Sequence, residues 1–178
     1  YPVPQNLKAT LFVALLERGE MRQALVFTRT KHRADRLAKH LMKEGVKAER
    51  IHGNRSQAQR TEVMAGFKSG KYRVLVATDI AARGIDVVAL GHVVNFDVPA
   101  VPEDYIHRVG RTGRAEMTGD AFTFVAPEEE GDLRGIERTI GKRLPRVIIP
   151  DFDYKATPDT KLEVPRGERL AAMRAQKS

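Results

Sequence analysis

The chain of 178 residues has no cysteine and no tryptophan, and only 6% of its residues are aromatic. Without cysteine, disulfide bonds and thiolate metal sites are excluded. No apolar run approaches the roughly 20 residues that a membrane-spanning helix needs. We therefore expect a cytoplasmic protein that makes no membrane contact. The length and the 42% hydrophobic content suit one domain with a substantial core and a tail.

Positive charge is in excess. The chain has 31 lysines and arginines against 23 acidic residues, a formal net charge of +8. Such a balance favours a polyanionic partner such as nucleic acid, although many soluble proteins are as basic. The charge therefore needs support from local motifs.

Strand-like apolar runs alternate with helical patterns along the chain. This alternation with short connections predicts a parallel β-sheet covered by helices. The expected strands are 24–27, 48–52, 73–77, 92–96 and 121–125. The expected helices are 31–43, 56–68, a helix that begins at Pro102, and 128–140. Ser56 is an expected helix cap, and Gly45 and Gly70 are expected to end helices. The pattern stops at about residue 151.

Polar and basic residues follow three of the expected strands. In a parallel sheet these positions meet at one edge, where ligands collect. Hydroxyl groups, backbone amides at helix starts and arginines are the groups that hold phosphates. The segments concerned are 28–31, 52–57 with Arg60, and 78–86.

A fourth segment, 107–114, reads His-Arg-Val-Gly-Arg-Thr-Gly-Arg. On a helix, His107, Arg111 and Arg114 share one face. Neighbouring guanidinium groups repel each other, whereas a polyanion between them would accept hydrogen bonds from both. A solvated basic helix is the alternative, but it would interleave Glu or Ala rather than the glycines at 110 and 113.

Residues 1–150 resemble the C-terminal RecA-like domain of DEAD-box ATP-dependent RNA helicases. Residues 25–31 resemble motif IV of that family, 57–60 motif IVa, 77–86 motif V and 107–114 motif VI, in the family's order. The segments 27–32 and 52–54 are most similar to the bacterial RhlE-type subgroup. Asn54 stands where many members have Asp, and Glu116 where a small residue commonly follows motif VI.

The resemblance implies the C-terminal half of an enzyme that couples ATP hydrolysis to local unwinding of RNA duplexes. Residues 1–5 would end an interdomain linker, 6–150 would form the RecA-like domain, and 151–178 a flexible or loosely docked extension. The chain contains no phosphate-binding loop and no Asp-Glu-Ala-Asp segment. Most of the ATP and its Mg²⁺ would therefore be bound by an N-terminal RecA-like domain, with no metal in this half. This half alone would be inactive.

The resemblance also assigns residues around ATP. Arg111 and Arg114 would be arginine fingers on the γ-phosphate, and His107 would couple the two domains by hydrogen bonding. Asp86, beside Gly84, would bind the ribose hydroxyls of ATP. A helix cap is the competing interpretation of Asp86.

RNA would be held through its sugar-phosphate backbone, since the site has few aromatic residues on which bases could stack. The residues assigned to RNA are Gly53, Gln57, Arg60, Thr78 and Gly84. Arg60 could instead pair with Glu62 or Glu49.

Two further residues are interpreted as structural. Arg108 points away from the face of His107 and is expected to pair with an acid of its own domain. Asp79 is expected to be a helix cap or a brace for Arg83. Two other classes of protein stay open: a DNA helicase of the RecQ kind, whose motif VI normally opens with Gln, and a binding module without activity.

Overall fold

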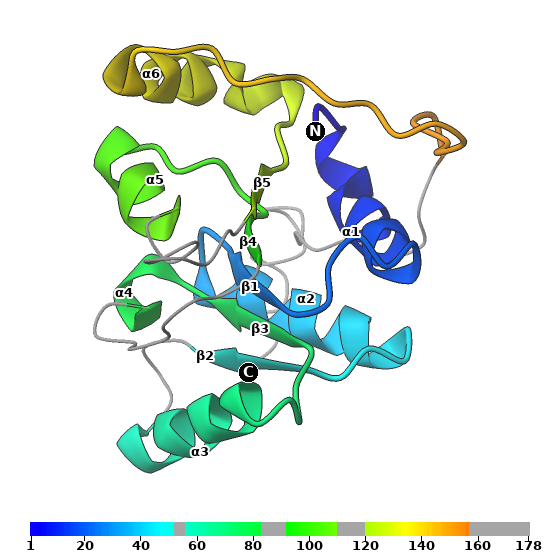
Figure 1. Cartoon of the computed structure of the whole chain (residues 1–178), viewed down its shortest axis with the longest axis vertical. Helices are drawn as coiled ribbons and strands as arrows, with labels where there is room; N and C mark the ends of the chain where they lie inside the picture. Colours follow the sequence, from blue (N-terminus) through cyan, green and yellow to red (C-terminus); the bar gives the residue numbers. More distant parts are fainter. Residues whose placement is uncertain (52–55, 83–91, 110–119, 157–178) are drawn as a thin grey trace, which may run out of the picture.

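A computed structural model of the chain describes residues 1–51, 56–82, 92–109 and 120–156. Five strands form one sheet in the order β2-β3-β1-β4-β5, and every neighbouring pair is parallel (Figure 1). The strands are β1 (Ala24–Phe27), β2 (Ala48–Ile51), β3 (Val74–Ala77), β4 (His92–Asn95) and β5 (Asp120–Thr123). The parallel α/β fold predicted from the sequence is confirmed, with strand ends shifted by up to two residues.

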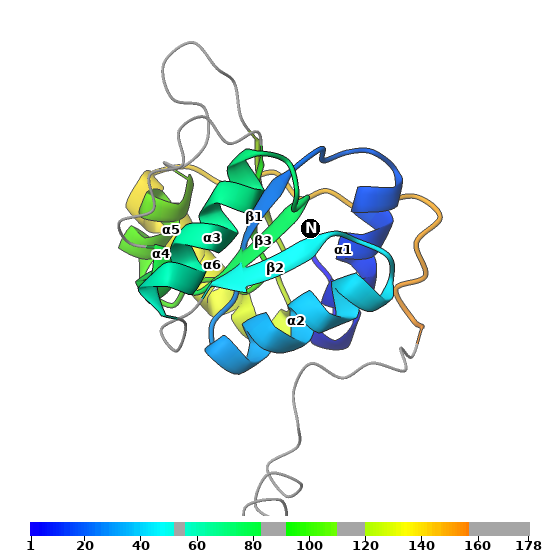
Figure 2. The same cartoon turned by 90° about the horizontal axis from the view of Figure 1, so that it is seen from below.

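Helices cover both faces of the sheet. They are α1 (Lys8–Glu17), α2 (Lys31–Lys43), α3 (Gln57–Lys68), α4 (Asp79–Ala82), α5 (Pro102–Val109) and α6 (Glu130–Ile140), with short 3-10 turns η1 (Gln5–Leu7) and η2 (Pro127–Glu129). In Figure 2, α1 and α2 lie on one side of the sheet and α3 on the other. The helix predicted over 128–140 is thus split: it opens with the 3-10 turn η2, which has Pro127 in its first turn.

The two faces of each central strand pack into different cores. Ala24 and Val26 of β1 belong to the core beneath α1 and α2. Leu25 and Phe27 belong to the core beneath α3. Because successive side chains of a strand point to opposite faces, a strand covered on both faces must be apolar throughout. This explains the continuous apolar runs in the sequence.

Helix α1 was not predicted from the sequence. Seven of its ten residues are buried, and its apolar residues lie all around the helix. The usual alternation of a polar and an apolar face is therefore missing, which removes the periodic signal of a surface helix.

Helix ends follow the local signals. Ser56 Oγ accepts a hydrogen bond from the Gln59 amide, and the Gln59 side chain accepts one from the Ser56 amide, which forms a capping box. Gly45 and Gly70, just after α2 and α3, have φ angles of 83° and 84°. These left-handed conformations favour glycine and confirm both predicted helix ends.

Both ends of the described chain are packed on the domain. Residues 1–3 run along β5, with the Val125 amide donating to the Tyr1 carbonyl at 3.0 Å and the Val3 amide to the Val125 carbonyl at 2.9 Å. Beyond α6, Phe152 and Tyr154 pack against the core of α1. The start of the predicted C-terminal extension is therefore docked, and its residues from 157 onward lie outside the described part.

Candidate functional site

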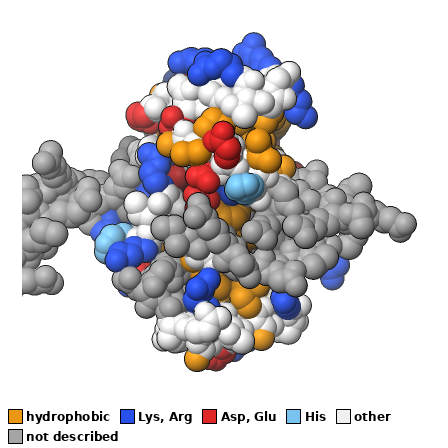
Figure 3. Space-filling model, turned by 90° about the vertical axis from the view of Figure 1, so that its left-hand side faces the viewer, with side chains coloured by type: hydrophobic (Ala, Val, Ile, Leu, Met, Phe, Trp, Pro, Cys, Tyr) orange, Lys and Arg blue, Asp and Glu red, His pale blue; other side chains and the backbone are white. Residues whose placement is uncertain are grey.

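The carboxyl edge of the sheet gathers the ends of β1, β3 and β4, as expected from the sequence. The Thr28 amide, just after β1, donates to the carbonyl of Ala77 at the end of β3 (2.9 Å). The Asp97 amide, just after β4, reaches back to the Phe27 carbonyl (3.4 Å). Segments far apart in the sequence therefore meet at one edge, and Figure 3 looks onto this side of the molecule.

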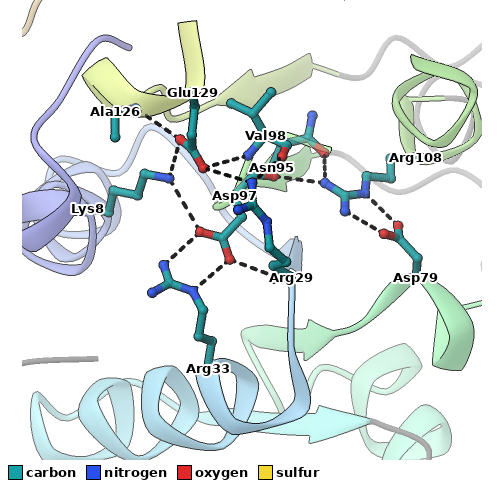
Figure 4. Close-up of polar contacts among 10 residues, drawn as sticks. All are labelled: Lys8, Arg29, Arg33, Asp79, Asn95, Asp97, Val98, Arg108, Ala126 and Glu129. Atoms are coloured by element: carbon teal, nitrogen blue, oxygen red, sulfur yellow. Dashed lines mark hydrogen bonds and ion pairs between the residues drawn. The ribbon is translucent and has the colours of Figure 1, made fainter. Parts of the chain in front are cut away.

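Asp97 is the centre of a buried charge cluster at this edge (Figure 4). Its Oδ2 accepts hydrogen bonds from the Arg29 amide and from Arg33 Nε, both at 2.8 Å. Its Oδ1 accepts from Arg33 Nη2 at 2.7 Å and lies 3.4 Å from Lys8 Nζ. Burial raises the pKa of this carboxyl, but the charges of Lys8 and Arg33 outweigh it and hold the pKa below its ordinary value. Asp97 is thus a structural anion, fully paired.

Glu129 completes the cluster from the other side. Its Oε2 lies 2.6 Å from Lys8 Nζ and accepts from the Ala126 amide at 3.0 Å. Its Oε1 accepts from the Val98 amide at 3.3 Å, and Arg29 Nη2 lies 3.6 Å from it. Lys8 itself has no exposed surface. The cluster therefore joins α1 to the loop after β4 and to η2.

Sequence reasoning missed this cluster. Its one local signal is Lys8, a cation followed by the apolar stretch of α1. Its partners Asp97 and Glu129 lie 89 and 121 residues further along the chain. No spacing rule of helices or strands connects such positions.

Arg108 forms a second hub, at the C-terminal end of α5 (Figure 4). Its Nε and Nη2 donate to the two carboxylate oxygens of Asp79, each at 2.6 Å. Its Nη1 donates to the Asn95 side chain (3.2 Å) and to the Asp97 carbonyl (3.0 Å), and its guanidinium lies 5.0 Å from the Phe27 ring centroid. The side chain is only 3% exposed. This confirms that Arg108 pairs with an acid of its own domain.

Asp79 is paired with Arg108 in the described part of the chain. Asp79 begins helix α4 and braces Arg108 rather than acting as the cap just before a helix. Arg83, its predicted partner, lies outside the described residues. Because an Arg-carboxylate pair with two parallel hydrogen bonds constrains both distance and orientation, α5 is held rigidly against α4.

Helix α3 meets the same edge. Arg60 Nη2 donates to the Ala81 carbonyl in α4 at 2.8 Å. Among the described residues, Arg60 is thus tied to α4 rather than to Glu62 or Glu49, and Glu49 lies beside Arg50. Gln57 is exposed at the first position of α3.

The remaining predicted site residues divide into two groups. Thr78 is half-buried between β3 and α4, and His107 is exposed on α5 next to Arg108. The others lie outside the described residues: Gly53, Gly84, Asp86, Arg111 and Arg114. The described part of the predicted site therefore consists of Gln57, Arg60, Thr78 and His107.

Within the described ranges, no three His, Asp or Glu side chains are grouped so that they could hold a metal ion. No helix in the same ranges is long and apolar enough to cross a membrane.

Comparison with known proteins gives this arrangement a family. Residues 7–116 match the helicase conserved C-terminal domain. The chain is 48% identical over 151 residues to the DEAD-box ATP-dependent RNA helicase CshA of Geobacillus kaustophilus and 47% identical over 151 residues to CshA of Bacillus subtilis. These alignments cover 85% of this chain but only 32% and 31% of the two relatives, so the chain spans about a third of their length.

Solved structures agree. The DEAD-box protein SrmB of E. coli, in a complex with regulator of ribonuclease activity A, superposes with a TM-score of 0.81 at 33% identity, covering 93% of this chain and 95% of that one. A DEAD box protein of Methanococcus jannaschii gives a TM-score of 0.74 at 42% identity, covering 80% of this chain and 39% of that one.

The parallel sheet and its charged carboxyl edge therefore define a RecA-like domain. More particularly, the chain belongs to the helicase conserved C-terminal domain family and is the C-terminal helicase domain of a DEAD-box RNA helicase.

Proposed function

We propose that the full-length protein is an ATP-dependent RNA helicase and that this domain closes onto an N-terminal RecA-like domain of the same chain. The supporting observation is the pair between Arg108 and Asp79. It joins α5, which contains the first residues of segment 107–114, to α4, which lies in segment 78–86. Both segments match helicase motifs, and their described starts meet at one edge of the sheet.

The proposed role in ATP hydrolysis belongs to the residues that follow α5. Arg111 and Arg114 act as arginine fingers that neutralise charge on the γ-phosphate during phosphoryl transfer. A finger works only when it is held in position, and the anchoring of α5 by Arg108 supplies a rigid base for it. Asp86 with Gly84 binds the ribose of ATP, and His107 couples the two domains.

ATP drives closure of the two domains around RNA, and its Mg²⁺ is held mainly by the N-terminal domain. The chain described here is therefore inactive alone in this proposal. Residues 1–5 serve as the end of the interdomain linker, and 151–178 as a C-terminal extension. The subgroup within the family is proposed to be RhlE-type, and the compartment the cytoplasm.

RNA is proposed to lie along the segments after β2 and β3. The exposed position of Gln57, and the link from Arg60 to α4 near Thr78, support a continuous surface there. Gly53 and Gly84 complete the set. A related structure, S. cerevisiae Dbp5 L327V at 31% identity and a TM-score of 0.73, is described as bound to RNA and ADP BeF3. The contacts are to the RNA backbone, so binding tolerates any sequence.

RNA-stimulated ATP hydrolysis by the full-length protein tests the proposal. The substitution Arg114→Ala should lower kcat by roughly 10³-fold or more, as loss of a finger does in GTPases. Lys39→Ala, an exposed cation on α2, is the matched control and should hydrolyse ATP normally. Near wild-type turnover by Arg114→Ala would contradict the assignment of the fingers.

A further inference from the structure

Helix α6 carries an exposed row of cations on the far side of the domain from α3. Arg134 and Arg138 are one helical turn apart, and Lys142 follows just beyond the end of the helix. All three are exposed. We call these three residues the α6 basic ridge. Figure 3 shows lysine and arginine side chains gathered at the top of the molecule, over α6.

Folding accounts for only part of this ridge. Among the residues that the structure describes, none of the three side chains forms an ion pair with an acid. Like charges at i and i+4 of a helix destabilise it by about 0.2–0.5 kcal/mol. The helix dipole favours cations in the last turn, which covers Arg138 but not Arg134. Glu130, four residues before Arg134, is placed to offset part of the charge of that arginine. Glu137, a nearby acid, is already paired with Arg146.

Helix α6 also carries two glycines beside the ridge. Gly131 lies three residues before Arg134, and Gly135 lies three residues before Arg138. Both glycines therefore share the helix face of the two arginines. A Cβ at Gly131 would meet no atom within 4 Å, and one at Gly135 would meet only the Arg138 side chain at 3.7 Å. Packing therefore does not require either glycine, although each costs a helix about 1 kcal/mol relative to alanine. Their absence of side chains leaves the backbone open to close approach.

Protein docking surfaces differ from this one. They centre on aromatic or aliphatic anchors. The described residues with large exposed apolar side chains are Met42, Val101, Ile106, Val147 and Ile148, and none of them belongs to α6. Cations on flexible stems without apolar anchors suit phosphate groups, which are bound mainly by charge.

We propose that the α6 basic ridge is a second RNA-backbone contact, which binds the part of an RNA strand that extends beyond the helicase site. This inference rests on the proposed RNA helicase function. In the sheet order, α3 follows one edge strand, β2, and α6 follows the other edge strand, β5. The two surfaces are thus separated by roughly 20 Å, the width of four strand spacings. A short RNA would reach only one of them, and a long one both.

The test is binding of fluorescent single-stranded RNA, short or long, to the chain at several salt concentrations. The double variant Arg134→Gln, Arg138→Gln should bind long RNA several-fold more weakly and short RNA as the wild type does. Its salt slope on long RNA should fall by roughly two, one for each lost phosphate contact. The matched control is Lys39→Gln with Lys43→Gln, which removes two exposed cations four residues apart on α2. This control should change neither the affinity for long RNA nor its salt slope.

A second variant separates binding from folding. Gly135→Ala should raise the midpoint of thermal unfolding, because alanine favours a helix, and yet weaken binding of long RNA. A purely structural glycine would show no such opposite effects.

The outcomes distinguish the two proposals. If Arg60→Ala weakens RNA binding but the ridge variants bind long RNA as the wild type does, the ridge is not an RNA contact and the helicase proposal stands. If the ridge variants lose affinity for an acidic peptide but not for RNA, the ridge is a protein contact and the inference is overturned. If the wild type binds neither the short nor the long RNA, the RNA-binding part of the proposed function fails as well.

Discussion

Single charged side chains decide how the carboxyl edge of this domain is built. Lys8, Arg33 and Arg108 are almost completely buried, and each is paired with an acid. Removal of one partner from a buried pair is costly because it leaves the other charge without compensation. Paired charges therefore hold the edge rigidly, and removal of one partner should lower the stability of the domain.

Asp97→Asn should destabilise the domain by about 3 kcal/mol near pH 7, since the buried Lys8 and Arg33 side chains lose the anion that they share. The folded-state pKa of Asp97 lies below its ordinary value. Its stabilising contribution is therefore complete above the unfolded-state pKa, about 3.9, and is lost as pH falls through the folded-state pKa. The cost of Asp97→Asn should shrink correspondingly in acid. Urea unfolding across pH measures this.

Glu62→Gln, at an exposed position on α3, is the control and should change stability little at any pH. A cost of Asp97→Asn that stays constant from neutral to strongly acidic pH would show that the carboxylate charge is not what stabilises the edge.

The pair between Arg108 and Asp79 should show strong coupling. In a double-mutant cycle with Arg108→Ala and Asp79→Ala, we expect an interaction free energy of about 1–3 kcal/mol from denaturant unfolding. Arg108→Lys should not rescue the pair, because an ammonium group cannot form two parallel hydrogen bonds. Additive effects of the two substitutions would mean that α4 and α5 are held together by packing alone.

At the scale of elements, the helices differ in what their glycines do. In α3, a Cβ on Gly66 would lie 2.5 Å and 2.9 Å from two ring atoms of Tyr72. The Tyr72 amide also donates to the Gly66 carbonyl at 3.3 Å. The absence of a side chain at 66 therefore sets how closely the turn into β3 packs on α3.

Gly66→Ala should destabilise the domain by about 1–3 kcal/mol, because overpacking outweighs the better helix propensity of alanine. Gly131→Ala, in the open face of α6, is the control and should stabilise by up to about 1 kcal/mol. Thermal unfolding of the two variants measures both effects. If Gly66→Ala proved as stabilising as Gly131→Ala, the Tyr72 ring would have to move freely.

For the whole molecule, the relevant fact is that the chain spans about a third of the curated relatives it matches. It contains no phosphate-binding loop. A domain that contributes only part of a ligand site makes few contacts with the ligand and binds it weakly.

The purified chain should therefore show no RNA-stimulated ATPase and only millimolar affinity for adenine nucleotides, as few-contact ligands do. A coupled ATPase assay and a nucleotide titration measure these quantities. Addition of the N-terminal domain in one polypeptide is the control that should restore activity. Robust turnover by the chain alone, with contaminating ATPases removed, would refute the half-site proposal.

Local sequence determined the fold class of this protein and its secondary structure apart from helix α1. Buried parallel strands must be apolar on both faces, and helix ends carry their own signals, such as the capping box at Ser56 and the left-handed glycines 45 and 70. The order of strands and helices then predicted the parallel sheet and the edge where ligands would collect. The family followed from four short motifs in the right order.

Tertiary structure alone decided which charges meet. Three kinds of contact join residues 21 or more positions apart along the chain. They are the ion pairs of Lys8, the pair between Arg108 and Asp79, and the hydrogen bond from Arg60 to α4. Helix α1 also escaped sequence analysis, since its apolar residues face other elements on nearly all sides. Such contacts depend on how the sheet orders its strands, and no local periodicity records that order.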